Sequence, residues 1–497
     1  MNVNPITRLD YPDLDVIRVE DTYYMVSTTM HFMPGCEILQ SFDLVHWEHV
    51  TYVYETLDHT DAQQLKSGQN IYGQGMWAAS LRYHEGRFCI CFVANDTRKT
   101  YLYTSEKIDG PWKKQLIEGF YHDGSLLFDE DGRNYIVYGN DEIWITELNE
   151  DLTAPKKGGL HRLLVSDHKN PELGYEGSHI QKINGYYYIF LVHSLRDRWM
   201  RTEACFYSDS LEGEFTGGDV LCDDRGYCGQ GVAQGGIVDT PDGKWYAMLF
   251  QDSGAVGRIP ILLPVTWKDH FPFFGQNGHV PEEIEVHSTR PGYIYQPLVG
   301  SDDFCNGLLP RWQFNHDPDP RYYHLDALQG TYTITTREVC TELTQAVNTL
   351  TQRMSYPSCA AEVTVDASAL KEGDVAGLCA LQSCYAAVGI TKHHGKYEVL
   401  MLDKKEDGIL DMTEGTVVES HQMDFRLEAD FCNMKDEARC YYRVNKGDWL
   451  PIGTVHKLYF KLDHFTGCRF GLFCYAAEET GGSACFRDFK YYDVDEI

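Results

Sequence analysis

Alternating apolar and polar residues dominate the chain, in short runs separated by turn residues. The stretch YEGSHIQKINGYYYIFLV, at 175–192, shows the recurring unit: an alternating run, the turn pair Asn184 and Gly185, and a second, aromatic-rich run. Successive side chains on a strand point to opposite faces, and Asn-Gly favours a two-residue turn. The unit therefore predicts a β-hairpin.

This hairpin recurs five times without a helical period between the copies. The second strands are expected at 21–29, 85–93, 131–139, 184–192 and 242–250. Their turn positions follow one another at intervals of 46–64 residues and are Thr22, Gly86, Gly132, Gly185 and Gly243. Repeats of this length built from strands alone are typical of a β-propeller with one four-stranded sheet, or blade, per repeat. We expect a five-bladed propeller over residues 1–298.

The rest of the chain has a different rhythm. Residues 287–300 read as a linker, and turn signals then separate short strands expected at 330–336, 359–367, 375–382, 385–392, 397–403, 458–465 and 470–477. This pattern predicts an antiparallel β-sandwich over residues 299–497, so the fold class is all-β. No catalytic pattern occurs in this second domain, and we expect it to pack against the propeller and shape the rim of its cavity.

Five residues stand nine positions before the five turns, and they are Asp13, Trp77, Asp123, Glu176 and Gln234. An equal offset from the turn places residues on the same face of equivalent strands. Since the first strand of each blade lines the central channel, we expect all five side chains to meet there. Each also has a plainer interpretation: an Asp after Pro12 suits a turn cap, the acids could lock the blades together, and Trp77 could fill the channel as readily as it could stack on a sugar.

Carboxylates in one cavity suit glycoside hydrolysis, which needs one acid to protonate the leaving oxygen and one base to activate water. Blades one and four stand across the channel, which favours the wider separation and inversion. Glu176 is the expected general acid, because its longer side chain lies beside Tyr175 and near other carboxylates. Asp13 is then the base, and Asp123 positions the sugar and keeps Glu176 protonated by like-charge repulsion. Arg258 either binds substrate hydroxyls or forms a surface ion pair.

Composition narrows the partners and the compartment. The net charge of −31 and the lack of a basic cluster argue against nucleic-acid binding. The chain lacks an apolar run long enough for a membrane span, and its first residues lack the features of a signal peptide. Its sixteen cysteines are scattered without a C-x-x-C pair, which favours a reduced, cytoplasmic protein.

Five phrases match a known pattern: YPDLDVIRVEDTYYMVSTTMHFMPG, WAASLRYHEGRF, HDGSLLFDEDGRNYIVYG, YEGSHIQKINGYYYIF and QGGIVDTPDGKWYAMLFQD. Over residues 4–300 they resemble the β-xylosidases and α-L-arabinofuranosidases of glycoside hydrolase family 43. The phrases WQFNHDPD, NTLTQR and GDVAGLCALQ look like the concanavalin-like β-sandwich of the β-xylosidase-type members.

The resemblance implies an inverting glycosidase that releases xylose, arabinose or both from the non-reducing end of plant cell-wall oligosaccharides. It assigns base, modulator and acid to Asp13, Asp123 and Glu176. The substrate-binding positions it suggests are Phe32, Trp77, Gln234 and Arg258. Cytoplasmic location would favour short imported oligosaccharides as substrates.

Three departures from the family pattern are Ala79, Ser178 and Ala233. Ala233 replaces a histidine that in many members helps hold a calcium ion or a water cluster, so no cofactor is expected and calcium at the axis is left open. A non-catalytic carbohydrate-binding propeller is the alternative function. Fructan-cleaving propellers are disfavoured, because the chain lacks N-D-P-N and R-D-P phrases. The sequence leaves open the choice between xylose and arabinose, association into a homo-oligomer, and exo or endo action, although a domain crowding the rim favours exo release.

Overall fold

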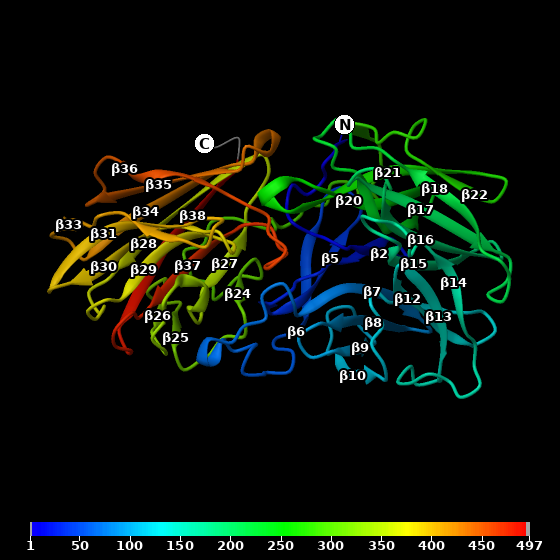
Figure 1. Ribbon diagram of the computed structural model, residues 1–497, viewed down its shortest axis with the longest axis horizontal. Coiled ribbons are helices and arrows are strands. Elements are labelled where there is room, and N and C mark those ends of the chain that lie inside the picture. Colours follow the sequence, from blue (N-terminus) through cyan, green and yellow to red (C-terminus); the bar gives the residue numbers. More distant parts are fainter. Residues whose placement is uncertain (1, 494–497) are drawn as a thin grey trace.

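The computed structural model describes residues 2–493 and consists almost entirely of β-strands in two domains (Figure 1). The first domain, blue to green in Figure 1, is a five-bladed β-propeller, and the second, yellow to red, is an antiparallel β-sandwich. The predicted fold class is therefore confirmed. The last strand before the sandwich ends at Ile284 and the next begins at Gln313, so the expected boundary at residues 298 and 299 falls between them.

Each blade is a four-stranded antiparallel sheet whose neighbouring strands follow one another in the chain. Blade one consists of β2 (Asp15–Val19), β3 (Thr22–Val26), β5 (Gly35–Ser41) and β6 (Glu48–Tyr54). Blade two consists of β7 (Met76–His84), β8 (Arg87–Ala94), β9 (Lys99–Ser105) and β10 (Lys113–Ile117). Blade three consists of β11 (Ser125–Phe128), β12 (Asn134–Asn140), β13 (Glu142–Leu148) and β14 (His161–Ser166). Blade four consists of β15 (Glu176–Ile183), β16 (Tyr186–Ser194), β17 (Arg201–Ser208) and β18 (Thr216–Leu221). Blade five consists of β19 (Val232–Asp239), β20 (Trp245–Asp252), β21 (Arg258–Lys268) and β22 (Phe271–Phe274).

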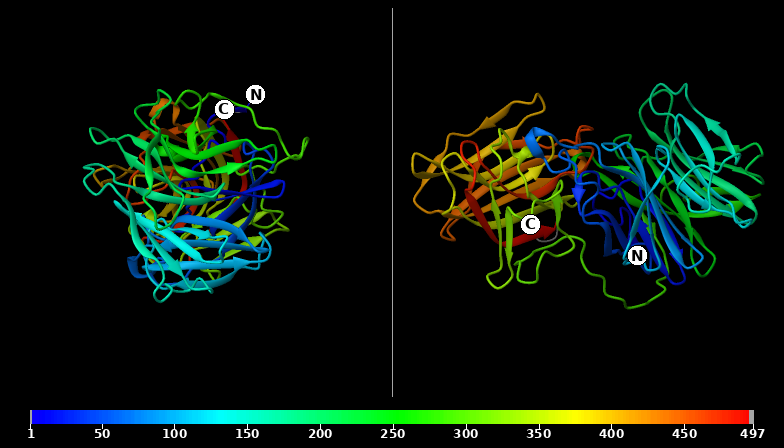
Figure 2. Two further views of the ribbon diagram at one scale, coloured as in Figure 1. Left: turned by 90° about the vertical axis from the view of Figure 1, so that its right-hand side faces the viewer. Right: turned by 90° about the horizontal axis from the view of Figure 1, so that it is seen from below.

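The first strand of every blade lies at the centre of the propeller. β2, β7, β11, β15 and β19 contact one another in that order, and β19 contacts β2 again, so the ring is closed. Outside the ring, β1 (Asn2–Val3) pairs with β23 (Glu283–Ile284). The right view of Figure 2 shows the two domains next to each other, with the connecting segment running along the outside.

A buried polar network ties the inner strands together along the axis. Asp15 accepts hydrogen bonds from the Leu81 amide at 2.8 Å and from the Arg82 guanidinium at 2.6 Å. The same guanidinium donates to Ser125 at 2.8 Å, and His179 lies 3.2 Å from Asp15. Burial alone would raise the pKa of Asp15, but Arg82 and His179 outweigh it and hold that pKa below its usual range. The network therefore fills the centre of the propeller between the inner strands.

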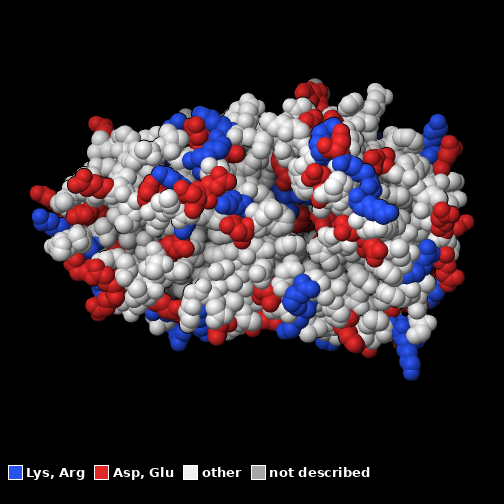
Figure 3. Space-filling view, viewed as in Figure 1, with Lys and Arg blue, Asp and Glu red and all other residues white. Residues whose placement is uncertain are grey.

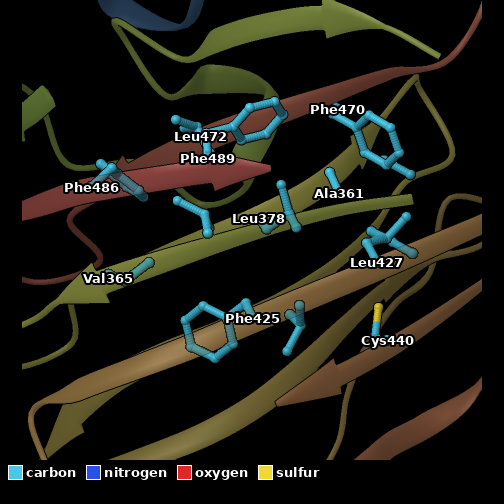
Figure 4. Packing of buried hydrophobic residues seen from close by; sticks show 14 of the residues in the cluster. Ala361, Val365, Leu378, Phe425, Leu427, Cys440, Phe470, Leu472, Phe486 and Phe489 are labelled. Atoms are coloured by element: carbon cyan, nitrogen blue, oxygen red, sulfur yellow. The ribbon is translucent and has the colours of Figure 1, made fainter. Parts of the chain in front are cut away.

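The sandwich consists of two antiparallel sheets. The first contains β24 (Gln313–Asn315), β27 (Leu350–Arg353), β29 (Val375–Leu381), β30 (Ala386–His393), β31 (Lys396–Lys404), β32 (Leu410–Met412), β33 (Thr416–Val418) and β37 (Arg469–Tyr475). The second contains β25 (Tyr323–Asp326), β26 (Thr331–Thr335), β28 (Ser358–Asp366), β34 (Gln422–Asp430), β35 (Glu437–Val444), β36 (Leu450–Lys457) and β38 (Ser483–Asp493). Alternate residues of both sheets, such as Leu378, Phe425 and Phe486, fill the space between them (Figure 4).

One expected strand of the sandwich is wrong. Residues 458–465, LYFKLDHF, do not form a strand, because β36 ends at Lys457 and the chain then leaves the sheet. Leu458 packs into the sandwich core, whereas the Phe460 and Phe465 rings lie against Arg258 of the propeller. Phe465 also takes a left-handed backbone conformation (φ 56°) that a strand does not permit. We call residues 458–467 the capping loop.

The two domains share a continuous interface. The short strand β4 (Phe32–Met33) leaves blade one and pairs with β24, extending the first sandwich sheet. Arg353 of the sandwich forms a buried ion pair with Glu37 of blade one at 2.8 Å. Apolar residues of the propeller, Ala255 and Val256 among them, belong to the sandwich core. The sandwich is therefore held in a fixed position over the propeller.

The surface carries both signs of charge. Figure 3 shows acidic and basic side chains interspersed over the face in view, without a continuous basic band. Across residues 2–493, the chain forms no helix with the length and apolar character that a membrane crossing requires.

Candidate active site

The predicted carboxylates converge where the inner strands begin. Asp13 and Asp123 lie just before β2 and β11, and Glu176 is the first residue of β15. Asp13 (φ 51°) and Asp123 (φ 48°) both adopt the left-handed conformation, which is uncommon for residues other than glycine.

The register differs from the equal offset that the sequence suggested. Val192 and Phe250 occupy the same position after their turns, yet Val192 pairs with Glu176 whereas Phe250 pairs with Ala233. The longer turn of blade five moves the equivalent position by one residue, so Ala233 rather than Gln234 corresponds to Glu176. β-Bulges at the starts of β15 and β19 then let neighbouring residues share the cavity.

Asp13 is almost fully buried and held from two sides. Its Oδ2 accepts a hydrogen bond from the Thr28 hydroxyl at 2.7 Å, and its Oδ1 accepts one from the Arg258 guanidinium at 2.9 Å. Only 2% of the Arg258 side chain and 9% of the Asp13 side chain are exposed. Arg258 is therefore a buried partner of Asp13 rather than a surface ion pair.

Asp123 and Glu176 form a second acidic group, in contact with His122. The Nε2 atom of His122 lies 3.5 Å from Asp123 Oδ2 and 3.6 Å from Glu176 Oε2. Burial raises the pKa of Asp123 to about 6; His122 opposes this rise, and Glu176 and Asp13 add to it. Asp123 also raises the pKa of His122 to about 9 against the effect of burial, and Glu176 contributes to the same rise.

Glu176 is the most accessible of the three acids, with 18% of its side chain exposed. Its Oε2 accepts a hydrogen bond from the Asn140 amide at 2.7 Å. The next residue, Gly177, donates its backbone N–H to Asp123 Oδ2 at 3.0 Å. A side chain at Gly177 would also meet Gln234, since an added Cβ would lie 2.8 Å from the Gln234 Cγ. The glycine therefore permits the close approach of blades three, four and five.

Aromatic rings border the site, including one from the second domain. The Phe465 ring of the capping loop lies 4.5 Å from the Arg258 guanidinium carbon, and its backbone carbonyl accepts a hydrogen bond from Arg258 at 3.3 Å. The Trp77 ring lies 5.5 Å from that of Phe465 and 6.0 Å from that of His122. Trp77 is therefore in place to contact a sugar.

Two expected substrate-binding residues are placed differently. Phe32 is only 2% exposed, because the Arg469 guanidinium lies 3.4 Å from its ring centre and His31 packs beside it. Its position in β4 makes it part of the domain interface, so stacking on a sugar does not fit its surroundings. Gln234 is buried beside Gly177, and its backbone N–H donates to Glu203 at 2.7 Å.

One group within residues 2–493 has the composition and spacing to hold a metal ion, namely His122, Asp123 and Glu176, whose ligand atoms lie within 4.8 Å of one another. Two of the three are the carboxylates needed for acid catalysis. A metal bound there would occupy the oxygen atoms that carry the proton, so this arrangement fits proton transfer better than a resident cation.

Four residues of the site were not predicted from the sequence, namely Thr28, His122, Asn140 and Phe465. His122 could have been found, because it precedes Asp123 directly in the phrase HDGS. Asn140 and Thr28 lie at the ends of second strands, where hydrogen-bonding side chains at the cavity mouth have no distinctive pattern. Phe465 was hidden because its segment reads as a strand.

The arrangement separates two kinds of carboxylate. Asp13 is paired with a cation and a hydroxyl donor, which suits a base that accepts a proton from water. Asp123 and Glu176 are close together and share a single imidazole, so one of them holds a proton more readily than an isolated acid does. A buried base and a more accessible acid at one site can cleave a glycosidic bond.

Comparison with known proteins gives matches over both domains. Residues 3–272 match the model of Glycosyl hydrolases family 43, and residues 301–492 match the Beta xylosidase C-terminal Concanavalin A-like domain. A Beta-xylosidase of Formosa agariphila is 26% identical over 99% of this chain and 89% of its own length. A Non-reducing end alpha-L-arabinofuranosidase of Bacteroides ovatus is 23% identical over 82% of this chain and 79% of its own.

Solved structures extend the match to the relative placement of the domains. A bifunctional GH43-CE protein of Bacteroides eggerthii superposes with a TM-score of 0.93 at 42% identity, covering 99% of this chain and 64% of that one. This chain therefore spans less than two thirds of that protein. A GH43 glycoside hydrolase whose active site was engineered to give both endo-xylanase and exo-arabinofuranosidase activity superposes with a TM-score of 0.86 at 27% identity, covering 99% of both chains.

Proposed function

Because the chain belongs to glycosyl hydrolases family 43, we propose that it is an inverting glycosidase that releases xylose, arabinose or both from the non-reducing ends of plant cell-wall oligosaccharides. Relatives named as a β-xylosidase and as an α-L-arabinofuranosidase support both sugars. The single observation that carries this proposal is the meeting of Asp13, Asp123 and Glu176 where the inner strands begin.

The reaction follows from the two carboxylate environments. Glu176 donates its proton to the glycosidic oxygen, and the bond between that oxygen and the anomeric carbon breaks. Asp13, oriented by Thr28 and Arg258, takes a proton from the water that attacks the opposite face of the sugar. Asp123 is buried between the other two acids in blade order, and its carboxylate, which accepts a hydrogen bond from the Gly177 backbone, is the proposed modulator of the acid.

The capping loop supports exo action. The pocket is closed below by the Asp15 network and bordered above by Phe465, which is held against Arg258 at the base. A long chain cannot pass through a pocket closed in this way, whereas a single terminal sugar can enter it. We propose that the β-sandwich completes the pocket rather than binding carbohydrate independently.

The proposal extends to the setting of the enzyme. Cleavage by paired carboxylates requires no cofactor, and the substrates are xylo- or arabino-oligosaccharides rather than nucleic acids or membranes. The sixteen cysteines are free, and most are buried, which supports a reduced, cytoplasmic location. Association into a homo-oligomer is compatible with this function but is not required by it.

The decisive test is release of sugar from xylobiose and from arabinoxylo-oligosaccharides, whose leaving alcohols must be protonated, by wild type and by Glu176→Ala. Removal of the general acid should lower turnover by roughly 10² to 10⁴. The matched control is Glu150→Ala, which removes an exposed glutamate from a turn of blade three and should leave turnover unchanged. Near-normal turnover of both substrates by Glu176→Ala would contradict the assignment. Binding of oligosaccharides without product from wild type would favour the carbohydrate-binding alternative.

A further inference from the structure

We propose that His122 is a positioning residue for the acid step: as an imidazolium between Asp123 and Glu176, it stabilises the Glu176 carboxylate that proton donation leaves behind. This inference rests on the proposed glycosidase function. It also identifies which residue tunes the pH dependence and the leaving-group preference of that reaction.

The first support is geometric. The Nε2 atom of His122 is nearly equidistant from the two carboxylates, at 3.5 Å from Asp123 and 3.6 Å from Glu176. Among residues 2–493 this buried atom has no hydrogen-bond partner. Distances slightly longer than a hydrogen bond are common in unliganded active sites and shorten when substrate binds. The ring therefore requires only a small movement to donate to the newly formed carboxylate.

The second support is the balance of charge around the ring. From blade one, Asp13 faces the site but is paired with Arg258. From blade four, Arg201 is paired with Asp252 at 2.9 Å, and blade two contributes the uncharged Trp77. His122 is thus the one cation within contact distance of Asp123 and Glu176 among the described residues. Asp123 raises the pKa of His122 to about 9, so the ring is charged at neutral pH.

The third support comes from following the charge through the reaction. The proton of Glu176 moves to the leaving oxygen, which takes the electron pair of the breaking bond. Water forms the new bond to the anomeric carbon and gives its proton to Asp13. One negative charge therefore disappears beside Arg258 and one appears beside His122. A fixed cation where charge develops lowers the barrier without reorganisation.

This role predicts an effect that depends on the leaving group. A nitrophenolate leaves with little help from an acid, whereas the alcohol of a sugar must be protonated. His122→Gln should lower kcat/KM on xylobiose or arabinoxylo-oligosaccharides by about 10- to 100-fold, and on nitrophenyl glycosides by less than about 3-fold. The alkaline limb of the kcat/KM profile should move to higher pH, because the variant lacks the positive charge that lies 3.6 Å from the Glu176 carboxylate.

Three variants separate charge from packing. His122→Phe keeps a ring of similar size without charge and should behave like His122→Gln if charge is the cause. His161→Gln changes a second histidine of blade three, on the outer strand β14, and should leave both substrates and the pH profile unchanged. Equal losses on both classes of substrate with an unmoved alkaline limb would show a merely structural role and overturn the inference.

A direct measurement remains decisive even if the variants fold poorly. Ring titration of His122 by NMR in the wild-type chain, with His122→Gln used for assignment, should give a transition well above pH 7. A transition at or below pH 6.5 would overturn the inference. Inactivity of wild type on every glycoside would instead contradict the proposed function, so the two failures are distinguishable.

Discussion

The buried ion pair between the domains provides the sharpest test of how the sandwich is held over the propeller. Arg353 of β27 lies 2.8 Å from Glu37 of β5, and 5% and 3% of these side chains are exposed. Arg353 also donates to the backbone carbonyl of Asp10 at 2.9 Å. Arg353→Met removes the cation and keeps most of the volume, so Glu37 retains only His49 as a charged partner, at 3.1 Å.

Two independent estimates give the magnitude. Breaking a buried pair by removing one partner costs about 3 to 5 kcal/mol. Burial alone would raise the pKa of Glu37, but Arg353 and then His49 bring it from 4.5 down to about 2. At about 1.4 kcal/mol for each pH unit, that difference corresponds to roughly 3 kcal/mol of stability. Because the folded-state pKa is lowered, this contribution is complete above pH 4.5 and is lost as the pH falls toward 2.

The assay is urea unfolding at pH 7, followed by tryptophan fluorescence after reversibility has been checked. Arg353→Met should be destabilised by about 3 kcal/mol. Adding Glu37→Gln should recover part of that loss, because it removes the unpaired charge. A loss below about 1 kcal/mol for Arg353→Met, or further destabilisation by Glu37→Gln in that background, would refute the reasoning.

Three further predictions follow from the site. Phe465→Ala should lower kcat/KM by roughly 10-fold, because the ring covers Arg258. The unfolding midpoint should change little, since the ring is only partly buried. Unchanged kinetics would show that the capping loop does not complete the pocket. Burial raises the pKa of Glu203 well above 4.5, so the folded protein favours the protonated form. The contribution of Glu203 to stability therefore falls as the pH rises from 4.5 toward that raised pKa. Glu203→Gln should therefore keep kcat/KM within about 2-fold. In urea titrations the variant should also lack the loss of stability that wild type shows as the pH rises. A markedly lower unfolding midpoint of the variant at pH 7 would show instead that Glu203 is charged. Treatment with EDTA should leave activity unchanged, and a loss restored by added calcium would contradict the proposal that no cofactor is needed.

Much of the fold could be predicted from local patterns. Hairpins are visible in a sequence because alternation and turn residues are properties of neighbouring positions, and five similar hairpins predict five blades. The pairing register of the strands was harder to predict from the sequence. The longer turn of blade five places Ala233, rather than Gln234, at the position equivalent to Glu176. An alternating pattern of apolar residues can also arise outside a strand. In the capping loop, Leu458 is buried without belonging to a strand.

The site was predicted in part for similar reasons. The acids occur at recognisable places before or at the first strand of a blade, so their convergence could be inferred. The partners that give each acid its role come from other strands and from the second domain. His122 and Asn140 distinguish Glu176 from Asp13, and only the three-dimensional contacts reveal them.

The stereochemistry of the first product tests most directly that Asp13 and Glu176 act as base and acid in one pocket. Proton NMR of wild-type enzyme acting on a β-xyloside should show α-xylose first, with the β anomer appearing later by mutarotation. For an α-L-arabinofuranoside the first product should be the β anomer. Appearance of the retained anomer first, with either substrate, would contradict a water activated by Asp13.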